Sequence, residues 1–280
     1  MNARAGVNAR AVLESAAQKL AAAGIAEPYA KAKVMTAHAL GIEYSQIAAH
    51  GDISPEAQAR IEEMTAQCAN GVPVEYATGK AYFRHLALNV DERVLIPRQE
   101  TELVAQCAID WIQRRGYENA LDMCTGSGCI AISLATETNA QVSAADISED
   151  ALELARHNAK LNLAQVRFIQ SDMFADVQGK YDLIVSNPPY VSEAEYDALD
   201  ISVKDYEPKA ALAAGDGLDF YRVIANEAVG YIRSGGALVL EIGADQGEDV
   251  KTLLNESGFL SIAVHRDYAG RDRIVTADRE

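Results

Sequence analysis

The sequence predicts an α/β protein in which a small helical segment precedes a parallel sheet covered by helices. Before residue 75, apolar residues recur only at helical spacing. Beyond residue 97, strand-like and helix-like stretches alternate, which is typical of a parallel sheet with crossover helices. The chain has 280 residues, of which 49% are hydrophobic. This length fits one large domain or two unequal ones.

The first 75 residues are expected to form a small bundle of short helices and no strands. Gly41 follows an apolar helical pattern, at a position where a helix end prefers the left-handed conformation. Ser54 and Pro55 combine a capping hydroxyl with a first-turn proline, which is typical of a helix start. We therefore expect a helical substrate-recognition domain over residues 1–75.

Residues 76–96 change in character and predict a hairpin linker between domains. Leu86, Leu88 and Val90 alternate with polar or small residues, and Tyr82-Phe83 precedes them across a short polar pair. Alternation of this kind is typical of a half-buried strand.

Residues 97–280 are expected to form the α/β domain. Two stretches, residues 100–114 and 148–161, have helical patterns. Residues 261–265 and 271–277 predict a terminal hairpin instead of another crossover. The candidate strands before it, in chain order, are residues 120–122, 142–146, 166–170, 182–186 and 237–242.

The charge and the cysteines exclude several classes of protein. The formal net charge is −16, which disfavours binding to free nucleic acid because phosphate contacts depend on Lys and Arg. No stretch reaches the ~18 apolar residues of a membrane span, and no leader pattern is evident. We expect a cytoplasmic protein without membrane attachment or a bound metal. Four cysteines lack metal-site spacing and are expected to be reduced thiols: Cys68, Cys107, Cys124 and Cys129.

A glycine-rich loop at residues 122–128 follows a predicted strand and opens a predicted helix. Its glycines allow a tight turn, and the helix N-terminus offers unpaired N–H groups to a nucleoside cofactor. Asp146 ends the next strand and can accept hydrogen bonds from both ribose hydroxyls. Asp172 follows the third strand, with Met173 beside it, where an adenine can be held. The same pattern satisfies the dinucleotide fingerprint, so the loop alone does not separate NAD from S-adenosylmethionine.

The tetrapeptide Asn187-Pro188-Pro189-Tyr190 follows the fourth predicted strand, at the edge where open α/β sheets bind ligands. The two prolines fix φ and remove N–H donors, so the turn presents acceptors in a stiff arrangement. The Asn187 side-chain oxygen and the Pro188 carbonyl can each accept one N–H of a planar NH2 group. Tyr190 is expected to stack on that group. This turn favours amino-group methylation and therefore S-adenosyl-L-methionine as the cofactor.

With these motifs the chain resembles the release factor glutamine N5-methyltransferases (HemK/PrmC family) over nearly its whole length. The resemblance implies a Rossmann-like, seven-stranded class I methyltransferase domain at residues 97–280, after a small all-helical domain and a β-hairpin linker. Cys124 and Met173 depart from the commonest forms of the family, which have Gly and often an aromatic there. Beyond the loop and the tetrapeptide, the family resemblance is based on residues 94–102, Glu207-Pro208, residues 215–222, residues 240–243, residues 245–247 and residues 269–273.

The resemblance also implies an activity and a site. The activity is methylation of the glutamine in the Gly-Gly-Gln loop of peptide-chain release factors, by a monomer that binds no nucleic acid directly. The implied catalytic residues are Asn187, Pro188, Pro189 and Tyr190. The implied cofactor-binding residues are Cys124, Thr125, Gly126, Ser127, Gly128, Asp146, Asp172, Met173 and Asn187.

Three other functions remain open from the residues themselves. A methyltransferase of nucleic-acid amino groups has the same tetrapeptide, but the net charge of −16 disfavours it. A glutamine methyltransferase acting on a ribosomal protein is equally compatible with the chemistry. A noncatalytic cofactor-binding protein is the alternative of another class, and only turnover separates it from an enzyme.

Overall fold

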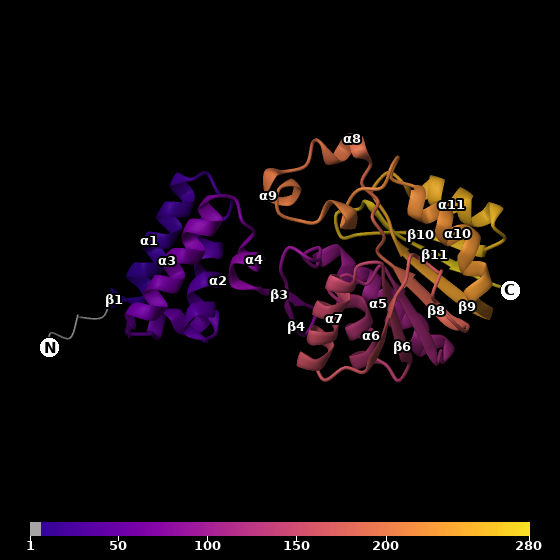
Figure 1. Ribbon diagram of the computed structural model, residues 1–280, viewed down its shortest axis with the longest axis horizontal. Coiled ribbons are helices and arrows are strands. Elements are labelled where there is room, and N and C mark those ends of the chain that lie inside the picture. Colours follow the sequence, from indigo (N-terminus) through magenta and orange to yellow (C-terminus); the bar gives the residue numbers. More distant parts are fainter. Residues whose placement is uncertain (1–6) are drawn as a thin grey trace. The chain divides into compact units, whose positions relative to one another are not determined.

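The computed structural model describes residues 7–280, which divide into two compact units (Figure 1). One unit comprises the chain up to Gly79 together with residues 200–206. The other comprises residues 80–199 and 207–280. None of the helices in the described part of the chain is long and apolar enough to cross a membrane.

The helical unit packs its helices around apolar side chains that include Leu13, Leu20, Met35 and Ile61. Gly41 ends the second helix in the left-handed conformation, and the Ser54 hydroxyl accepts from the N–H of Ala57, as the sequence predicts. The helices are α1 (Ala9–Ala22), α2 (Pro28–Leu40), η1 (Tyr44–Ala49), α3 (Pro55–Ala69), α4 (Val74–Thr78) and, from the later segment, α9 (Ile201–Lys204).

The expectation that this region contains helices alone is wrong in one detail. Two-residue strands β1 (Val7–Asn8) and β2 (Asp52–Ile53) pair in antiparallel fashion. Val7 faces Ile53 in this pairing. A pair this short has no alternating pattern to read in the sequence, because it consists of backbone hydrogen bonds between segments far apart in the chain.

The larger unit contains a seven-stranded sheet in the order β10-β11-β9-β8-β5-β6-β7. The five strands from β9 to β7 are parallel, and β11 and β10 form an antiparallel terminal hairpin. The strands are β5 (Asn119–Met123), β6 (Gln141–Asp146), β7 (Val166–Gln170), β8 (Tyr181–Ser186), β9 (Ile232–Glu241), β10 (Leu260–Arg266) and β11 (Asp272–Asp278). The predicted parallel sheet and terminal hairpin are thus confirmed.

β9 begins five residues earlier than the predicted residue 237. Ile232 already pairs with Tyr181, and the register then shifts before Ala237 pairs with Leu183. Gly236 lies in the shift, where an added Cβ would come within 2.7 Å of the Asp182 carbonyl oxygen. The residues at this bulge are polar or glycine and do not alternate with apolar ones, so the sequence pattern does not predict the first part of the strand.

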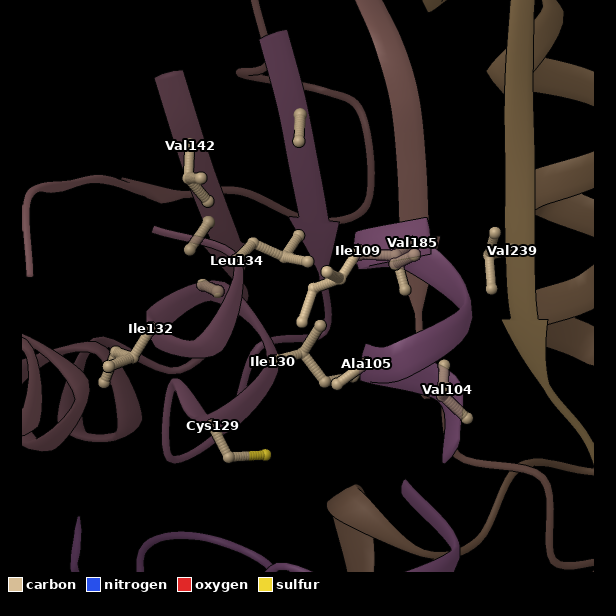
Figure 2. Close-up of a cluster of buried hydrophobic side chains, with 14 of the residues drawn as sticks. Val104, Ala105, Ile109, Cys129, Ile130, Ile132, Leu134, Val142, Val185 and Val239 are labelled. Atoms are coloured by element: carbon tan, nitrogen blue, oxygen red, sulfur yellow. The ribbon is translucent and has the colours of Figure 1, made fainter. Parts of the chain in front are cut away.

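Each face of the sheet is covered by its own helices. Along β9, Val239 belongs to the cluster beneath α5 and α6, whereas Leu238 and Leu240 belong to the cluster beneath α10 and α11. Figure 2 shows the first cluster, with Ile109 of α5 and Ile130 of α6 near Val185 of the sheet. The helices of the larger unit, including those that do not cover the sheet, are α5 (Gln99–Arg115), α6 (Cys129–Glu137), α7 (Glu149–Leu161), α8 (Glu193–Tyr196), η2 (Lys209–Ala211), α10 (Asp219–Tyr231) and α11 (Gly247–Glu256).

A hairpin of β3 (Lys80–Phe83) and β4 (Leu86–Asn89) belongs to this unit and is tied to it by a buried asparagine. The Asn158 amide group donates to the carbonyl oxygens of Asn89 and Ser127, both at 3.0 Å. Its side-chain oxygen accepts from the Asn89 N–H at 2.7 Å. One side chain on α7 therefore joins the hairpin to the glycine loop.

We predict that Asn158→Ala lowers the free energy of unfolding by about 2–3 kcal/mol, because it leaves buried backbone groups without partners. Urea denaturation followed by circular dichroism measures the change. The neighbouring exposed His157→Ala is the control and should stay within about 0.5 kcal/mol of wild type. Equal stability of the two variants would show that the Asn158 bonds contribute nothing net.

Candidate active site

A cavity lies in the larger unit where the parallel strands β5, β6 and β8 end. Apolar side chains dominate its lining, and carboxylates from two successive strand ends reach its edge. The lining residues include Arg98, Thr101, Cys124, Thr125, Gly126, Ser127, Asp146, Asp172, Met173, Asn187, Pro189 and Pro208.

The two glycines of the loop have different surroundings, although both have a positive φ, of 52° at Gly126 and 83° at Gly128. A Cβ added at Gly126 would meet nothing within 4 Å, which leaves the backbone open to the cavity. A Cβ at Gly128 would approach Ile132 Cδ1 at 3.1 Å and Ala155 Cβ at 3.2 Å. Gly126 therefore allows close approach of a ligand, and Gly128 allows α6 and α7 to pack closely.

The loop is held in shape by Asp122, which is fully buried beneath it. Its Oδ2 accepts from the Thr125 hydroxyl at 2.6 Å and from the Ala131 N–H at 3.0 Å. Burial raises the pKa of Asp122 to about 7, against the lowering effect of these two hydrogen bonds. The carboxyl group thus fixes the start of α6, although burial disfavours its ionised form.

Asp146 lies at the end of β6 and faces the cavity. Its Oδ2 accepts from the Gly126 N–H at 2.9 Å, and its Oδ1 accepts from the Ser148 N–H at 3.0 Å. Burial raises its pKa, and these backbone hydrogen bonds oppose the rise. Each oxygen keeps a lone pair for a further donor, which fits a pair of vicinal hydroxyls.

Asp172 and Met173 line the cavity on the side of Asp146. Asp172 is exposed at the end of β7, and Met173 is buried with a positive φ of 47°. The Met173 sulfur lies 4.0 Å from the Cys124 sulfur. The two positions where the chain departs from the family's commonest form are therefore neighbours, and together they shape one wall of the cavity.

The Asn187–Tyr190 turn follows β8 directly, as predicted, but its four residues face different ways. Asn187 and Pro189 line the cavity. The Asn187 amide nitrogen donates to the Thr101 hydroxyl at 3.2 Å. Tyr190 is largely buried among apolar residues, and its hydroxyl donates to Glu241 Oε1 at 3.4 Å. Gly128, Pro188 and Tyr190 are absent from the cavity lining, so the expected stacking by Tyr190 stays a prediction.

The turn is fastened from behind by Gln246. Its amide nitrogen donates to the carbonyl oxygens of Tyr190 at 2.9 Å and Gly217 at 3.1 Å, and its oxygen accepts from the Gly243 N–H. An added Cβ at Gly217 would lie 2.8 Å from the Tyr190 carbonyl oxygen. Three segments separated in sequence thus meet at one side chain, which holds the turn in place.

A second group of hydrogen bonds, to the Glu207 carboxylate, holds another part of the cavity rim. The buried Glu207 carboxylate accepts from the Ile96 N–H at 3.1 Å and from the Arg98 guanidinium. Arg98 and Pro208 both line the cavity. Sequence reasoning assigned no role to Arg98, Thr101, Glu207, Glu241 or Gln246. Their only signal was their presence in the motifs that carry the family resemblance.

Comparison with known proteins gives the family of the chain. A family model described as "Methyltransferase small domain" matches residues 101–204, and one described as "PrmC N-terminal domain" matches residues 11–79. A release factor glutamine methyltransferase of Chlorobaculum tepidum is 42% identical and aligns over 89% of this chain and 90% of its own length. One from Moorella thermoacetica is 40% identical over 96% and 98%.

Solved structures share the fold. A methyltransferase from Pyrococcus furiosus has a TM-score of 0.53 at 20% identity and covers 79% of this chain and 97% of its own. The sheet, the glycine loop and the strand-end acids define a class I S-adenosylmethionine-dependent methyltransferase. Within this class the chain belongs to the release factor glutamine methyltransferase family.

We predict that Asp146→Asn weakens S-adenosylmethionine binding about 10- to 100-fold, because the amide replaces one charged acceptor by a donor. Contacts to the ribose hydroxyls are equally strong in the ground state and the transition state. The rate at saturating cofactor should therefore change much less than the affinity. Calorimetric titration and initial rates measure the two effects. Unchanged affinity, or tight binding of NAD instead, would contradict the placement of the cofactor.

We also predict that stability falls as pH rises from about 4 to 7. Burial raises the pKa values of Asp122 and Glu241 to about 7. In this window the folded state retains protons that the unfolded state has released, so each group contributes a loss on the order of 2 kcal/mol. Carboxylates with a lowered pKa, such as Glu137, act below this window.

Urea denaturation at pH 5 and pH 7.5 tests this prediction. Glu241→Gln does not ionise and should reduce the difference between the two pH values. A free energy of unfolding that stays constant or rises over this interval in the wild-type protein would rule it out.

Proposed function

We propose that the protein transfers the methyl group of S-adenosyl-L-methionine to the side-chain amide nitrogen (N5) of the glutamine in the Gly-Gly-Gln loop of peptide-chain release factors. The observation that carries the proposal is the position of Asn187. Its amide lies at the rim of the cofactor cavity, directly after β8, with its nitrogen already bonded to Thr101. The amide oxygen is thereby left to accept an N–H from a substrate.

The acidic side chains Asp146 and Asp172 in the lining and the open backbone at Gly126 support binding of the cofactor in this cavity. We propose that the open backbone at Gly126, with Cys124, Thr125, Ser127 and Gly128, contacts the methionine end, and that Asp146 holds the ribose. Asp172 and Met173 flank the adenine. When bound, S-adenosylmethionine supplies a methyl group on a positively charged sulfur. All other contributions to the reaction come from the positioning of the amide.

The amide nitrogen of glutamine is a poor nucleophile because its lone pair is delocalised. In our proposal, the Asn187 side-chain oxygen and the Pro188 carbonyl oxygen accept its two N–H groups, which orients the nitrogen and polarises its bonds. The methyl group would replace one of the two hydrogens, the cofactor sulfur would keep the electron pair of the broken sulfur–methyl bond, and the released proton would pass to water. Pro189 stiffens the turn, and Tyr190 anchors it through its hydroxyl, so the acceptors do not reorganise during the reaction.

A glutamine between glycines suits this rim. Glycine has no side chain, so the substrate backbone can come close to a turn that is itself rigid. We further propose that the helical unit contacts the release factor away from that loop, and that the enzyme acts in the cytoplasm as a monomer without binding nucleic acid. The net charge of −16 supports the last point.

We predict that Asn187→Ala lowers the rate of methyl transfer ~10²- to 10³-fold, because it removes a preorganised acceptor. The fold and the affinity for S-adenosylmethionine should persist. Intact release factor, radiolabelled cofactor and mass spectrometry of the Gly-Gly-Gln peptide measure the transfer, with wild type as control. Methyl groups on a nucleobase or on a ribosomal protein, with the release factor unmodified, would refute the proposed substrate.

A further inference from the structure

A positively charged side chain, Arg98, lines the cavity and has no part in the proposed reaction. It directly precedes α5, and 35% of its side chain is exposed. One of its terminal nitrogens, Nη2, donates a hydrogen bond to Glu207 Oε1. Within residues 7–280, its Nε and Nη1 atoms have no hydrogen-bond partner. A guanidinium group has five N–H donors, so most of those of Arg98 are free to bind a ligand.

The buried Glu207 carboxylate fixes the direction of this guanidinium. Its side chain is 1% exposed, and its other oxygen, Oε2, accepts from the Ile96 N–H at 3.1 Å. The backbone therefore holds the carboxylate, and the carboxylate holds Arg98 through a charge-assisted hydrogen bond. The pairing also offsets the cost of burying the charge of Glu207. Arg98 is thus held on one side and keeps its remaining donors for the cavity.

Among residues 7–280, only one other basic residue, Arg93, lines the cavity, and its donors are already engaged. The Nε and Nη2 atoms of Arg93 donate to the two oxygens of Asp91, both at 2.8 Å. Its Nη1 lies 3.5 Å from Glu153 Oε2. All three nitrogens of Arg93 therefore have acidic partners. Arg98 is the cation of the lining that has donors left for an anion.

S-adenosylmethionine has one negative group, the carboxylate of its methionine part. Asp146 and Asp172 cannot bind this group, because ionised carboxylates only accept hydrogen bonds. The methyl group must face the Asn187 turn, and the short methionine chain leaves the same sulfur atom. Arg98 and Thr101 belong to one segment of the lining, and Thr101 accepts from the Asn187 amide nitrogen. The methionine carboxylate therefore lies within reach of the segment that contains Arg98.

The start of α5 also favours an anion at this place. The helix has 17 residues, and no side chain caps its N-terminus. The N–H groups of its first turn carry the positive end of the helix dipole. Thr101 of this turn lines the cavity, whereas the acids of the turn, Glu100 and Glu102, are absent from the lining in the described part of the chain.

We propose that Arg98 binds the carboxylate of the methionine part of the cofactor, and that Glu207 is the positioning residue that directs the Arg98 guanidinium at it. The inference rests on the proposed function, which places the methionine end of the cofactor in this part of the cavity. Arg98 fixes the far end of the methionine chain. The sulfur is thereby held with its methyl group toward the Asn187 turn.

The test compares two ligands that differ only in the carboxylate. Decarboxylated S-adenosylmethionine retains the sulfonium and the ammonium group, so the other contacts persist. Wild type should bind S-adenosylmethionine about 10- to 100-fold more tightly than this ligand, as expected for charge-assisted hydrogen bonds. Arg98→Met should weaken binding of S-adenosylmethionine by a similar factor and change the dissociation constant of the decarboxylated ligand less than about threefold. Calorimetric titration in the absence of release factor measures these constants.

Two further variants separate the role of Arg98 from a general effect on the cavity. Arg93→Met is the matched control, because it removes the other guanidinium of the lining, and it should change both dissociation constants less than about threefold. Arg98→Lys retains the charge but loses the planar fork of donors, so its preference for the carboxylate should lie between those of Arg98→Met and wild type. It provides a second measurement if Arg98→Met does not fold.

Glu207→Gln tests the positioning role. Its amide keeps the size of the side chain but can direct a donor at the guanidinium, so the preference for the carboxylate should fall about 3- to 10-fold. In the Arg98→Met background, the same substitution should cause no further fall in that preference. A purely structural role of Glu207 would weaken both ligands alike and leave the ratio of their dissociation constants unchanged.

Three results would overturn the inference. The first is an equal loss of affinity for the two ligands in Arg98→Met. The second is an unchanged affinity of this variant for S-adenosylmethionine, including the case in which only the KM for release factor rises. The third, which concerns Glu207, is an unchanged ratio of the two constants in Glu207→Gln. Each can occur while wild type methylates the release factor, so the proposed function would stand. Absence of methylation by wild type, with the ligand preferences as expected, would instead refute the proposed substrate.

Discussion

The structure depends on one constraint: the parallel strands β5, β6 and β8 and the second half of β9 are buried on both faces. Leu121 and Ile184 face the helices α10 and α11, while Ala120 and Val185 face α5 and α6. With both faces apolar, polar side chains can leave the sheet only where the strands end. The acids of the cofactor cavity and the Asn187 turn therefore meet at one edge. The position of the site follows from the way the core is packed.

Two buried carboxyl groups, whose ionised forms are disfavoured by burial, lie at that edge. Asp122 and Glu241 are fully buried carboxyls with raised pKa values, and each leaves one oxygen unpaired in the described part of the chain. Asp122 shapes the glycine loop on the proposed cofactor side, and Glu241 lies behind the Asn187 turn on the proposed substrate side. A core without them would be more stable at neutral pH. Both carboxyls therefore serve the geometry of the site more than the stability of the fold.

The substrate side is assembled from segments that are far apart in sequence. Gln246 joins the turn to Gly217, Glu207 joins the far rim to Arg98, and Thr101 reaches Asn187 from α5. Each of these contacts spans more than 20 residues of chain, and each involves a residue type that is common on protein surfaces. The cofactor side is more local, since the loop from Asp122 to Gly128 is one short segment with its own turn geometry.

The sequence by itself determined the order of strands and helices, the glycine loop, the strand-end acids and the turn after β8, because periodicity, capping and turn chemistry act between near neighbours. It also carried the family resemblance. Only the tertiary structure decided the strand pair β1–β2, the early start of β9, the inward direction of Tyr190 and the partners of Asn187. These features arise from hydrogen bonds and packing between distant segments. Local sequence patterns carry no information about which of those segments will meet.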